Sequence, residues 1–186
     1  VARGTLLQQT ITESTSGSGF PYRTVSNTNI QWDGVSYGAS PPTTGSHKGW
    51  FINMLTTSTA NLGEMVVFQP VLRSGRVIFT TLVPEDRPCV AGGFSWLMEV
   101  NYRNGGKLPF EVFDINNDNI FDSDDRISGD TVSGIKTNTG ISPDVVIIDD
   151  PSRGRELKIT TGTKGTVESV KNNPGPNAGQ QRRSWR

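Results

Sequence analysis

The sequence predicts an all-β fold, and three features of its composition lead to that prediction. Only 33% of the 186 residues are apolar, whereas glycine (21 residues) and proline (11 residues) are abundant. Uninterrupted runs of good helix formers are nearly absent, so we expect no long helices. β-Branched and aromatic residues occur instead in short bursts between turn residues, which is the pattern of consecutive short strands. The spacing of these bursts fits a sandwich or the blades of a propeller.

The expected strands follow one another along most of the chain. Residues 76–83 form a nearly continuous apolar run, which predicts a strand buried on both faces. Gly75 precedes this run and can adopt a positive φ at low cost, so we expect a tight turn there. The remaining expected strands are 4–13, 22–26, 29–32, 49–54, 64–68, 70–72, 94–100, 145–148, 156–160 and 166–170.

The chain is expected to form one domain, 1–186, that is a fragment of a longer protein. Its length allows one good-sized core, and it begins at Val1 with no recognisable signal peptide. No stretch reaches the length of a transmembrane helix. Residues 171–186 are rich in proline, glycine and asparagine at their start, and we expect them to be a flexible tail.

The charge balance argues against a protein that binds nucleic acid. The chain has 18 basic and 18 acidic residues, whereas proteins that bind nucleic acid usually carry a basic excess. Arg182, Arg183 and Arg186 form a small basic cluster, which is typical of a solvated tail. Cys89 is the only cysteine, so no disulfide can form within the chain.

One segment, Asp114–Asp125, has the spacing of a calcium-binding loop. Ile120 stands at position seven, where an EF-hand loop donates a backbone carbonyl, and Asn119 stands at position six, where glycine is usual. Asparagine tolerates a positive φ better than most residues, so the sharp turn can still form. Side chains with oxygen atoms fall at loop positions one, three, five, nine and twelve: Asp114, Asn116, Asp118, Asp122 and Asp125.

The charge of this loop favours a bound cation. Two carboxylates about 4 Å apart repel by about 4 kcal/mol at an effective dielectric constant of about 20, and the loop has four aspartates at the predicted ligand positions. Calcium is favoured over magnesium because it accepts more oxygen ligands in flexible geometry. The lack of nearby histidine or cysteine disfavours zinc. The alternative is a metal-free loop of turns, in which aspartate and asparagine are common.

Catalytic motifs are absent from the sequence, and we expect no enzyme. His47 is the only histidine and lies in a loop beside Lys48, which disfavours a Ser-His-Asp triad. Cys89 has no nucleophile motif around it, and residues 91–93 lack the lysine of a phosphate-binding loop. The acidic cluster could imitate the carboxylate pair of a glycosidase, but a metal site explains its spacing better.

Several blocks, in their order along the chain, resemble a known family. Residues 49–51 (Gly-Trp-Phe), 70–84 (from Pro70-Val71-Leu72 to Val83-Pro84), 88–89 (Pro-Cys) and 92–99 (Gly-Gly-Phe-Ser-Trp-Leu-Met-Glu) are similar to the C-terminal domain of the PilC/PilY type IV pilus tip proteins. The opening residues 6–11 with 22–26, and the closing residues 183–186, are similar too. The resemblance covers nearly the whole chain.

This resemblance implies a fold, a location and a role. The fold would be the C-terminal part of a modified β-propeller with the calcium loop inserted. The protein would be exported to the pilus tip, outer membrane or cell surface, where it would contact minor pilins and the pilus tip complex. It would take part in pilus assembly, twitching motility, virulence and adhesion to host or abiotic surfaces, with calcium tied to the balance of pilus extension and retraction.

The resemblance also implies a ligand set for calcium, to which the EF-hand spacing adds Asp125. Asn116 departs from the family pattern, in which an aspartate is common at that position. The residues implied by the resemblance are Asp114, Asn116, Asp118, Ile120 through its carbonyl, and Asp122.

Two other classes of protein fit the loop less well. A calcium-stabilised cell-surface binding module without a pilus role could be dockerin-like or another adhesin. A dockerin needs two such loops, each followed by a helix, and the chain has one loop. A hydrolase of a calcium-stabilised β family would need a base or nucleophile that the sequence does not supply.

Overall fold

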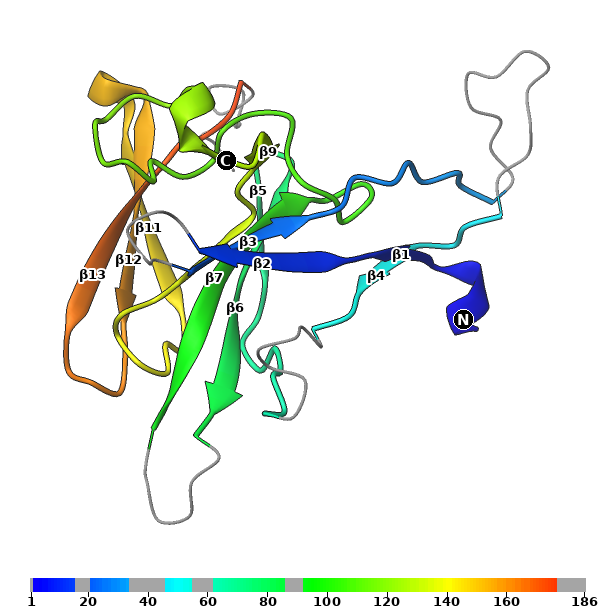
Figure 1. Ribbon diagram of the computed structural model, residues 1–186, viewed down its shortest axis with the longest axis horizontal. Coiled ribbons are helices and arrows are strands. Elements are labelled where there is room, and N and C mark those ends of the chain that lie inside the picture. Colours follow the sequence, from blue (N-terminus) through cyan, green and yellow to red (C-terminus); the bar gives the residue numbers. More distant parts are fainter. Residues whose placement is uncertain (1, 16–20, 34–45, 55–61, 86–91, 177–186) are drawn as a thin grey trace, which may run out of the picture.

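The computed structural model describes residues 2–15, 21–33, 46–54, 62–85 and 92–176, and its regular structure is almost entirely β (Figure 1). The all-β prediction is therefore confirmed. The elements within these ranges are η1 (Arg3–Thr5), β1 (Leu7–Gln9), β2 (Ile11–Thr15), β3 (Pro21–Val25), β4 (Trp50–Ile52), β5 (Val71–Arg73), β6 (Arg76–Pro84), β7 (Gly93–Asn101), η2 (Ser123–Asp125), β8 (Arg126–Ile127), β9 (Asp130–Thr131), β10 (Gly134–Lys136), β11 (Val145–Asp150), η3 (Pro151–Arg153), β12 (Arg155–Thr161) and β13 (Val167–Asn172).

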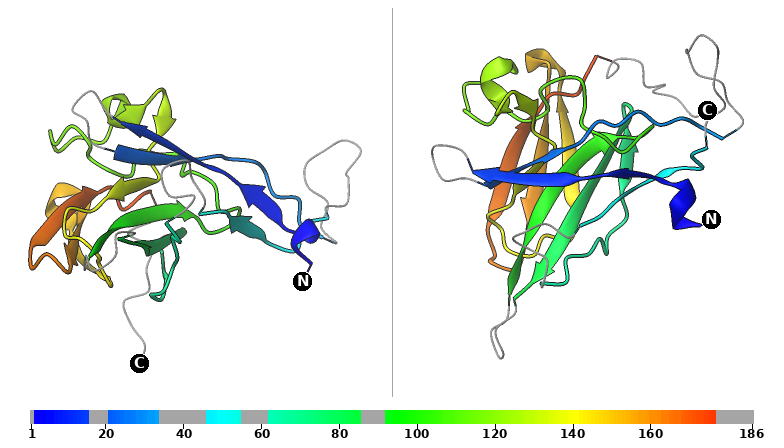
Figure 2. Two further views of the ribbon diagram at one scale, coloured as in Figure 1. Left: turned by 60° about the horizontal axis from the view of Figure 1, so that its bottom comes forward. Right: turned by 45° about the vertical axis from the view of Figure 1, so that its right-hand side comes forward.

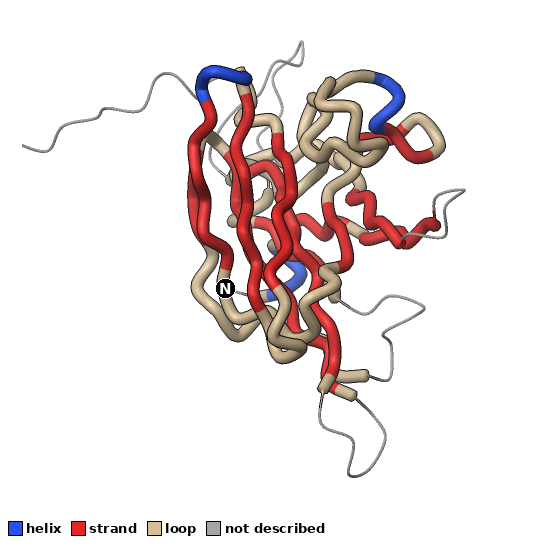
Figure 3. The backbone as a smooth tube through the Cα atoms, turned by 90° about the vertical axis from the view of Figure 1, so that its left-hand side faces the viewer, coloured by secondary structure: helices blue, strands red, loops and turns tan. Residues whose placement is uncertain are grey.

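Two sheets make up most of the fold. The larger has six strands in the order β2-β3-β10-β7-β6-β5, and the smaller has three in the order β11-β12-β13. Figure 2 shows the two sheets from further sides, and Figure 3 looks onto the smaller sheet from outside. The β1–β4 pair is parallel, and β8–β9 is a short antiparallel pair. The described strands form no closed barrel or propeller, so the modified propeller remains a prediction.

The core lies on both faces of the central β6–β7 pair. Ile78 of β6 and Leu97 of β7 pack with Val145 and Val170 of the smaller sheet in one hydrophobic cluster. Phe79 of β6 points to the opposite face and packs in a second cluster with residues of β3 and β7. Successive side chains of a strand point to opposite faces, so β6 is buried on both sides. The prediction for residues 76–83 is thus confirmed.

The two sheets are also joined by buried charges. Arg76 donates to Glu99 (Nη1–Oε2, 3.0 Å) and to Glu156 (Nη2–Oε2, 2.9 Å). Lys158 lies 2.6 Å from Glu99 (Nζ–Oε1), and the Asn172 amide donates to the same oxygen at 2.8 Å. Each of these side chains is at most 1% exposed. The network therefore fixes β6 and β7 against β12 and β13 by opposite charges removed from water.

Because of this network, the stability of the fold depends on pH. Burial would raise the pKa of Glu156, but the hydrogen bond from Arg73 and the charges of Lys158 and Arg76 outweigh it and hold the pKa below the ordinary value of 4.5. A carboxylate whose folded pKa is lowered stabilises the fold fully above its unfolded pKa, and this contribution is lost as pH falls through the folded value.

We therefore expect the urea midpoint to fall when pH is lowered from about 6 to about 3. Replacing Arg73 by methionine removes one cause of the lowered pKa, so the variant should lose less stability over the same range. Urea denaturation of both proteins at the two pH values measures the difference. An identical pH dependence in the two proteins would contradict this assignment.

The tight turn before β6 forms as predicted. Ser74 (φ 48°) and Gly75 (φ 77°) are both left-handed, and Arg73 pairs with Arg76 across them. Two positive φ values in a two-residue loop are the geometry that matches the twist of a hairpin.

The structure differs from the sequence prediction at three of the expected strands. Residues 4–13 contain the end of η1, all of β1 and the start of β2, because the chain leaves the partner of β1 at Thr10 and pairs with β3 instead. Residues 29–32 and 64–68 make only single bridges, Trp32 with His47 and Met65 with Leu82. The short strands β8, β9 and β10 were not predicted.

The start of the predicted flexible tail is an ordered strand. Lys171 and Asn172 are the last residues of β13, and the Asn173 N–H donates to the Val112 carbonyl at 2.8 Å. This long-range pairing overrides the loop-like composition that follows. Residues 177–186, with the basic cluster, lie outside the described residues, as does Cys89. No helix in the described ranges is long and apolar enough to cross a membrane.

Candidate metal centre

The predicted calcium loop, residues 114–125, lies between β7 and β8 in the chain and ends in the short helix η2 (Figure 1). Its start is held by Phe113, which is 1% exposed and bridges to Asn172. The Asp114 N–H donates to the Lys171 carbonyl at 3.3 Å. The first predicted ligand is therefore fixed to β13 by its own backbone.

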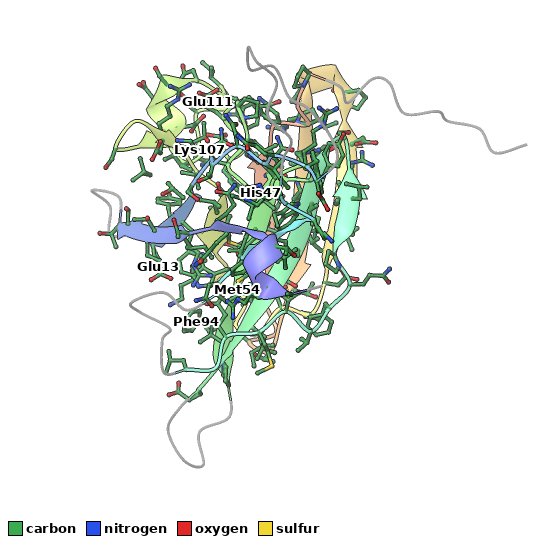
Figure 4. All side chains as sticks on the ribbon, turned by 90° about the vertical axis from the view of Figure 1, so that its right-hand side faces the viewer. Glu13, His47, Met54, Phe94, Lys107 and Glu111 are labelled. Atoms are coloured by element: carbon green, nitrogen blue, oxygen red, sulfur yellow. The ribbon has the colours of Figure 1, made fainter. Side chains whose placement is uncertain are left out.

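Two ion pairs support the segments that flank the loop. Arg126 donates to Glu111 (Nε–Oε1, 2.7 Å), and Lys107 pairs with Asp130. Figure 4 labels Lys107 and Glu111, which lie on the same side of the molecule. Both pairs include a side chain that is at least 40% exposed, so their contribution to stability is small.

Two asparagines of the loop adopt left-handed backbone conformations. Asn119 has φ 70°, which confirms the positive φ expected at position six, and Asn117 has φ 65°. Each side-chain carbonyl accepts a hydrogen bond from a basic residue of the smaller sheet: Asn117 Oδ1 from Lys171 Nζ at 2.5 Å, and Asn119 Oδ1 from Arg155 Nη1 at 2.7 Å. These two bonds attach the loop to β12 and β13.

Asp114 has a buried oxygen with no donor. Its side chain is 0% exposed. Oδ2 accepts from the Asn119 N–H at 3.0 Å and lies 3.4 Å from Lys171 Nζ. Oδ1 has no hydrogen-bond partner among the described residues. A buried carboxylate oxygen without a donor is unfavourable unless a cation reaches it, so this atom suits a metal ligand.

The next predicted ligands fold into the loop by local turns. Asn116 Oδ1 accepts from the Asp118 N–H at 3.0 Å, and Asp118 Oδ1 accepts from the Ile120 N–H at 2.7 Å. The Asn116 amide also donates to Asp118 Oδ2 at 2.9 Å. Asp122 Oδ1 accepts from the N–H of Asp124 at 2.9 Å and caps η2. The side chain of Ile120 is 57% exposed.

Asp125 closes the loop from inside. It is 0% exposed, Oδ1 accepts from the Ile115 N–H at 2.7 Å, and Oδ2 accepts from the Asp122 N–H at 3.3 Å. Burial raises the pKa of Asp125, and this effect outweighs the backbone N–H groups, which lower it. Both oxygens of the position-twelve residue are thus engaged by the two ends of the loop.

The donor set fits a hard cation. It consists of carboxylate, amide and peptide oxygens, which are the ligands that calcium prefers. The structure brings Asn116 and Asp118 into direct contact, joins Asp122 to Asp125, and connects Asp114 to the turn at Asn119. No group of three or more His, Cys, Asp or Glu side chains forms a metal cluster in the described part of the chain. The predicted set relies on an amide and a peptide carbonyl beside its carboxylates.

Sequence reasoning did not find Lys171 and Arg155, the two basic residues that contact the loop. They lie 54 and 36 residues from their partners, so no local motif indicates them. Lys171 also lines a pocket of about 390 Å³ beside the loop. The walls of this pocket include Tyr22, Phe113, Asp114, Ile135, Glu168 and Val170.

The chain is similar over its whole length to known proteins. The type IV pilus biogenesis factor PilY1 of Pseudomonas aeruginosa strain PAO1 is 27% identical over 199 residues, covering 100% of the chain. PilY1 of strain UCBPP-PA14 is 33% identical over 143 residues, covering 73% of it. The chain is a homologue of PilY1. A PilY1 homologue of Xylella fastidiosa strain Temecula1 is 27% identical over 177 residues, or 91% of the chain.

The chain spans only 12–15% of the length of these PilY1 relatives. No protein-family model matches it. Among solved structures, the C-terminal domain of Pseudomonas aeruginosa PilY1 has a TM-score of 0.71 at 23% identity, covering 95% of this chain and 33% of that one. The fold is therefore that of part of the PilY1 C-terminal domain, which confirms the family resemblance seen in the sequence.

Proposed function

We propose that this chain is a calcium-binding module of a type IV pilus biogenesis protein. The PilY1 relatives and the shared fold support the pilus role. The single observation that carries calcium binding is the buried Asp114 Oδ1, which has no donor among the described residues, at the first position of a loop with EF-hand spacing.

In this proposal the ligands are those implied by the family pattern, and Asp125 has a separate role. Asp125 holds both ends of the loop together through the N–H groups of Ile115 and Asp122, so that the ligands stay in place. A bound calcium ion would supply the positive charge that offsets the loop carboxylates. The proposed ligands are Asp114, Asn116, Asp118, the Ile120 carbonyl and Asp122.

Calcium would act in the pilus by fixing the loop against the smaller sheet. The loop is anchored to β13 through the Asp114 N–H and the Lys171 carbonyl, so a change in the loop reaches the sheet directly. At the pilus tip, outer membrane or cell surface, this surface would contact minor pilins or the pilus tip complex. The balance of extension and retraction, twitching motility and adhesion would then respond to calcium.

Calorimetric titration with calcium tests the metal site. The unmodified chain should bind one calcium ion, and Asp118→Ala should weaken binding by about 100-fold or abolish it, because a charged ligand is lost. Asp33→Ala removes a carboxylate that pairs with Lys48 outside the loop, so it should bind like the unmodified chain. No heat at millimolar calcium in the unmodified chain would rule the site out. Retained binding in Asp118→Ala would place the site elsewhere.

The pilus role is tested by introducing Asp118→Ala into the full-length protein. Surface pilus number and twitching should change, whereas Asp33→Ala should leave both as they are. Unchanged motility with lost calcium binding would contradict a calcium-dependent pilus role. It would favour the alternative, a surface module that uses calcium only for stability.

A further inference from the structure

We propose that Lys171 is an internal counter-ion of the calcium loop. Its ammonium group neutralises Asp114 when no metal is bound, which keeps the loop folded and lowers its affinity for calcium. This inference rests on the proposed calcium site and adds a residue that sets the affinity of that site.

The ammonium group of Lys171 lies beside Asp114, the first proposed ligand. Lys171 Nζ lies 3.4 Å from Asp114 Oδ2 and donates to Asn117 Oδ1 at 2.5 Å. The Lys171 side chain is 23% exposed, and the Asp114 side chain is 0% exposed. The pairing of Lys171 with Leu157 in β12, and its carbonyl bond with the Asp114 N–H, fix the lysine backbone beside the loop. The ammonium group therefore lies beside the carboxylate in the folded chain.

The two oxygens of Asp114 differ in their partners. Oδ2 meets the Asn119 N–H and the Lys171 ammonium group, whereas Oδ1 has no partner among the described residues. Calcium at Oδ1 would therefore share one carboxylate with Lys171. Two cations a few ångströms apart repel, and partial exposure and salt reduce this repulsion without removing it. We expect Lys171 to weaken calcium binding by about 3- to 10-fold at physiological salt.

The other basic residue at the loop does not have this role. Arg155 donates to the neutral Asn119 side chain at 2.7 Å, and its charge is already paired with Asp150 at 3.0 Å. No contact joins Arg155 to a predicted carboxylate ligand among the described residues. Lys171 is thus the basic side chain whose charge competes with calcium.

The pocket beside the loop also contains a second carboxylate, Glu168, which has its own partner. Lys171 and Glu168 both line this space of about 390 Å³. Glu168 is held through hydrogen bonds from Asn138 at 2.8 and 2.9 Å. No contact joins Lys171 to Glu168 among the described residues, so the Lys171 charge acts on Asp114.

The test compares Lys171→Met with the unmodified chain by calcium titration and thermal denaturation. The calcium Kd should fall by about 3- to 10-fold at low to moderate salt, and the gain should shrink in about 0.5 M salt. The calcium-free Tm should fall, because Asp114 loses its counter-ion, and the Tm rise on adding calcium should become larger. Lys171→Arg should restore the original Kd. Lys164→Met removes the same charge from the exposed β12–β13 hairpin and should leave the Kd unchanged.

Other results would overturn the inference. A purely structural role for Lys171 would lower Tm equally with and without calcium and leave the Kd unchanged. Weaker calcium binding in Lys171→Met would show that the lysine organises the loop for the metal. Calcium binding by Lys171→Met but not by the unmodified chain would far exceed the expected effect of about 3- to 10-fold, and would contradict this account of the lysine. If neither binds, both the proposed site and this inference fail.

Discussion

Replacing Glu99 by alanine is expected to destabilise the domain by about 3–5 kcal/mol. Glu99 is 0% exposed and accepts from Arg76, Lys158 and Asn172. Its removal leaves two buried cations with only Glu156 to balance them, and buried charges that lose a partner cannot regain water. Urea denaturation near neutral pH measures the loss.

A surface pair provides the matched control for Glu99. Asp130 pairs with Lys107, and the Asp130 side chain is 51% exposed, so Asp130→Ala should cost less than about 1 kcal/mol. Glu99→Gln keeps the shape and removes the charge, and should fall between the two. A loss below about 1 kcal/mol in Glu99→Ala would mean that the network does not hold the sheets together.

The second large effect is expected at Gly105, where alanine should cost about 2–4 kcal/mol. Gly105 has φ 69°, and a Cβ there would lie 2.2 Å from Cε3 of the Trp50 ring. The ring cannot easily move, because its Nε1 donates to the Tyr102 carbonyl at 3.0 Å. Steric overlap and the left-handed backbone both act against the side chain. Thermal and urea denaturation of Gly105→Ala test this expectation.

A second glycine, Gly129, separates the cost of steric overlap from the cost of the left-handed backbone. It has φ 83°, and a Cβ there would meet nothing within 4 Å, so Gly129→Ala should cost only about 1 kcal/mol. Combining Gly105→Ala with Trp50→Leu should recover part of the loss, since the ring is gone. Equal costs for the two glycine variants would show that the contact with Trp50 is unimportant.

Features that depend on neighbouring residues could be predicted from the sequence. The turn at Gly75 and the positive φ of Asn119 follow from local sterics, and both are present. The strand at 76–83 follows from a hydrophobic run, and β6 has nearly the same bounds. The spacing of the acidic loop can likewise be read from the sequence, because all of its predicted ligands lie within twelve consecutive residues.

Features that depend on distant pairing could not be predicted. Lys171 belongs to a strand because β12 and Phe113–Asp114 flank it, and neither is near it in sequence. The change of partner at Thr10 has the same origin, since β1 pairs with β4 and β2 with β3. The backbone donors that hold Asp125 also become visible only when the loop is folded.

The alternation of β13 places two polar residues in very different surroundings. Lys171 reaches the acidic loop, and Asn172, the next residue, contacts Glu99 in the dry interior. A slip of one residue would put Lys171 into the charge-balanced interior as a third cation. It would also leave the neutral Asn172 amide, in place of the ammonium group, beside the buried carboxylate of Asp114. Electrostatics therefore selects the register of β13 alongside hydrophobicity, which excludes mispaired arrangements that apolar packing alone would tolerate.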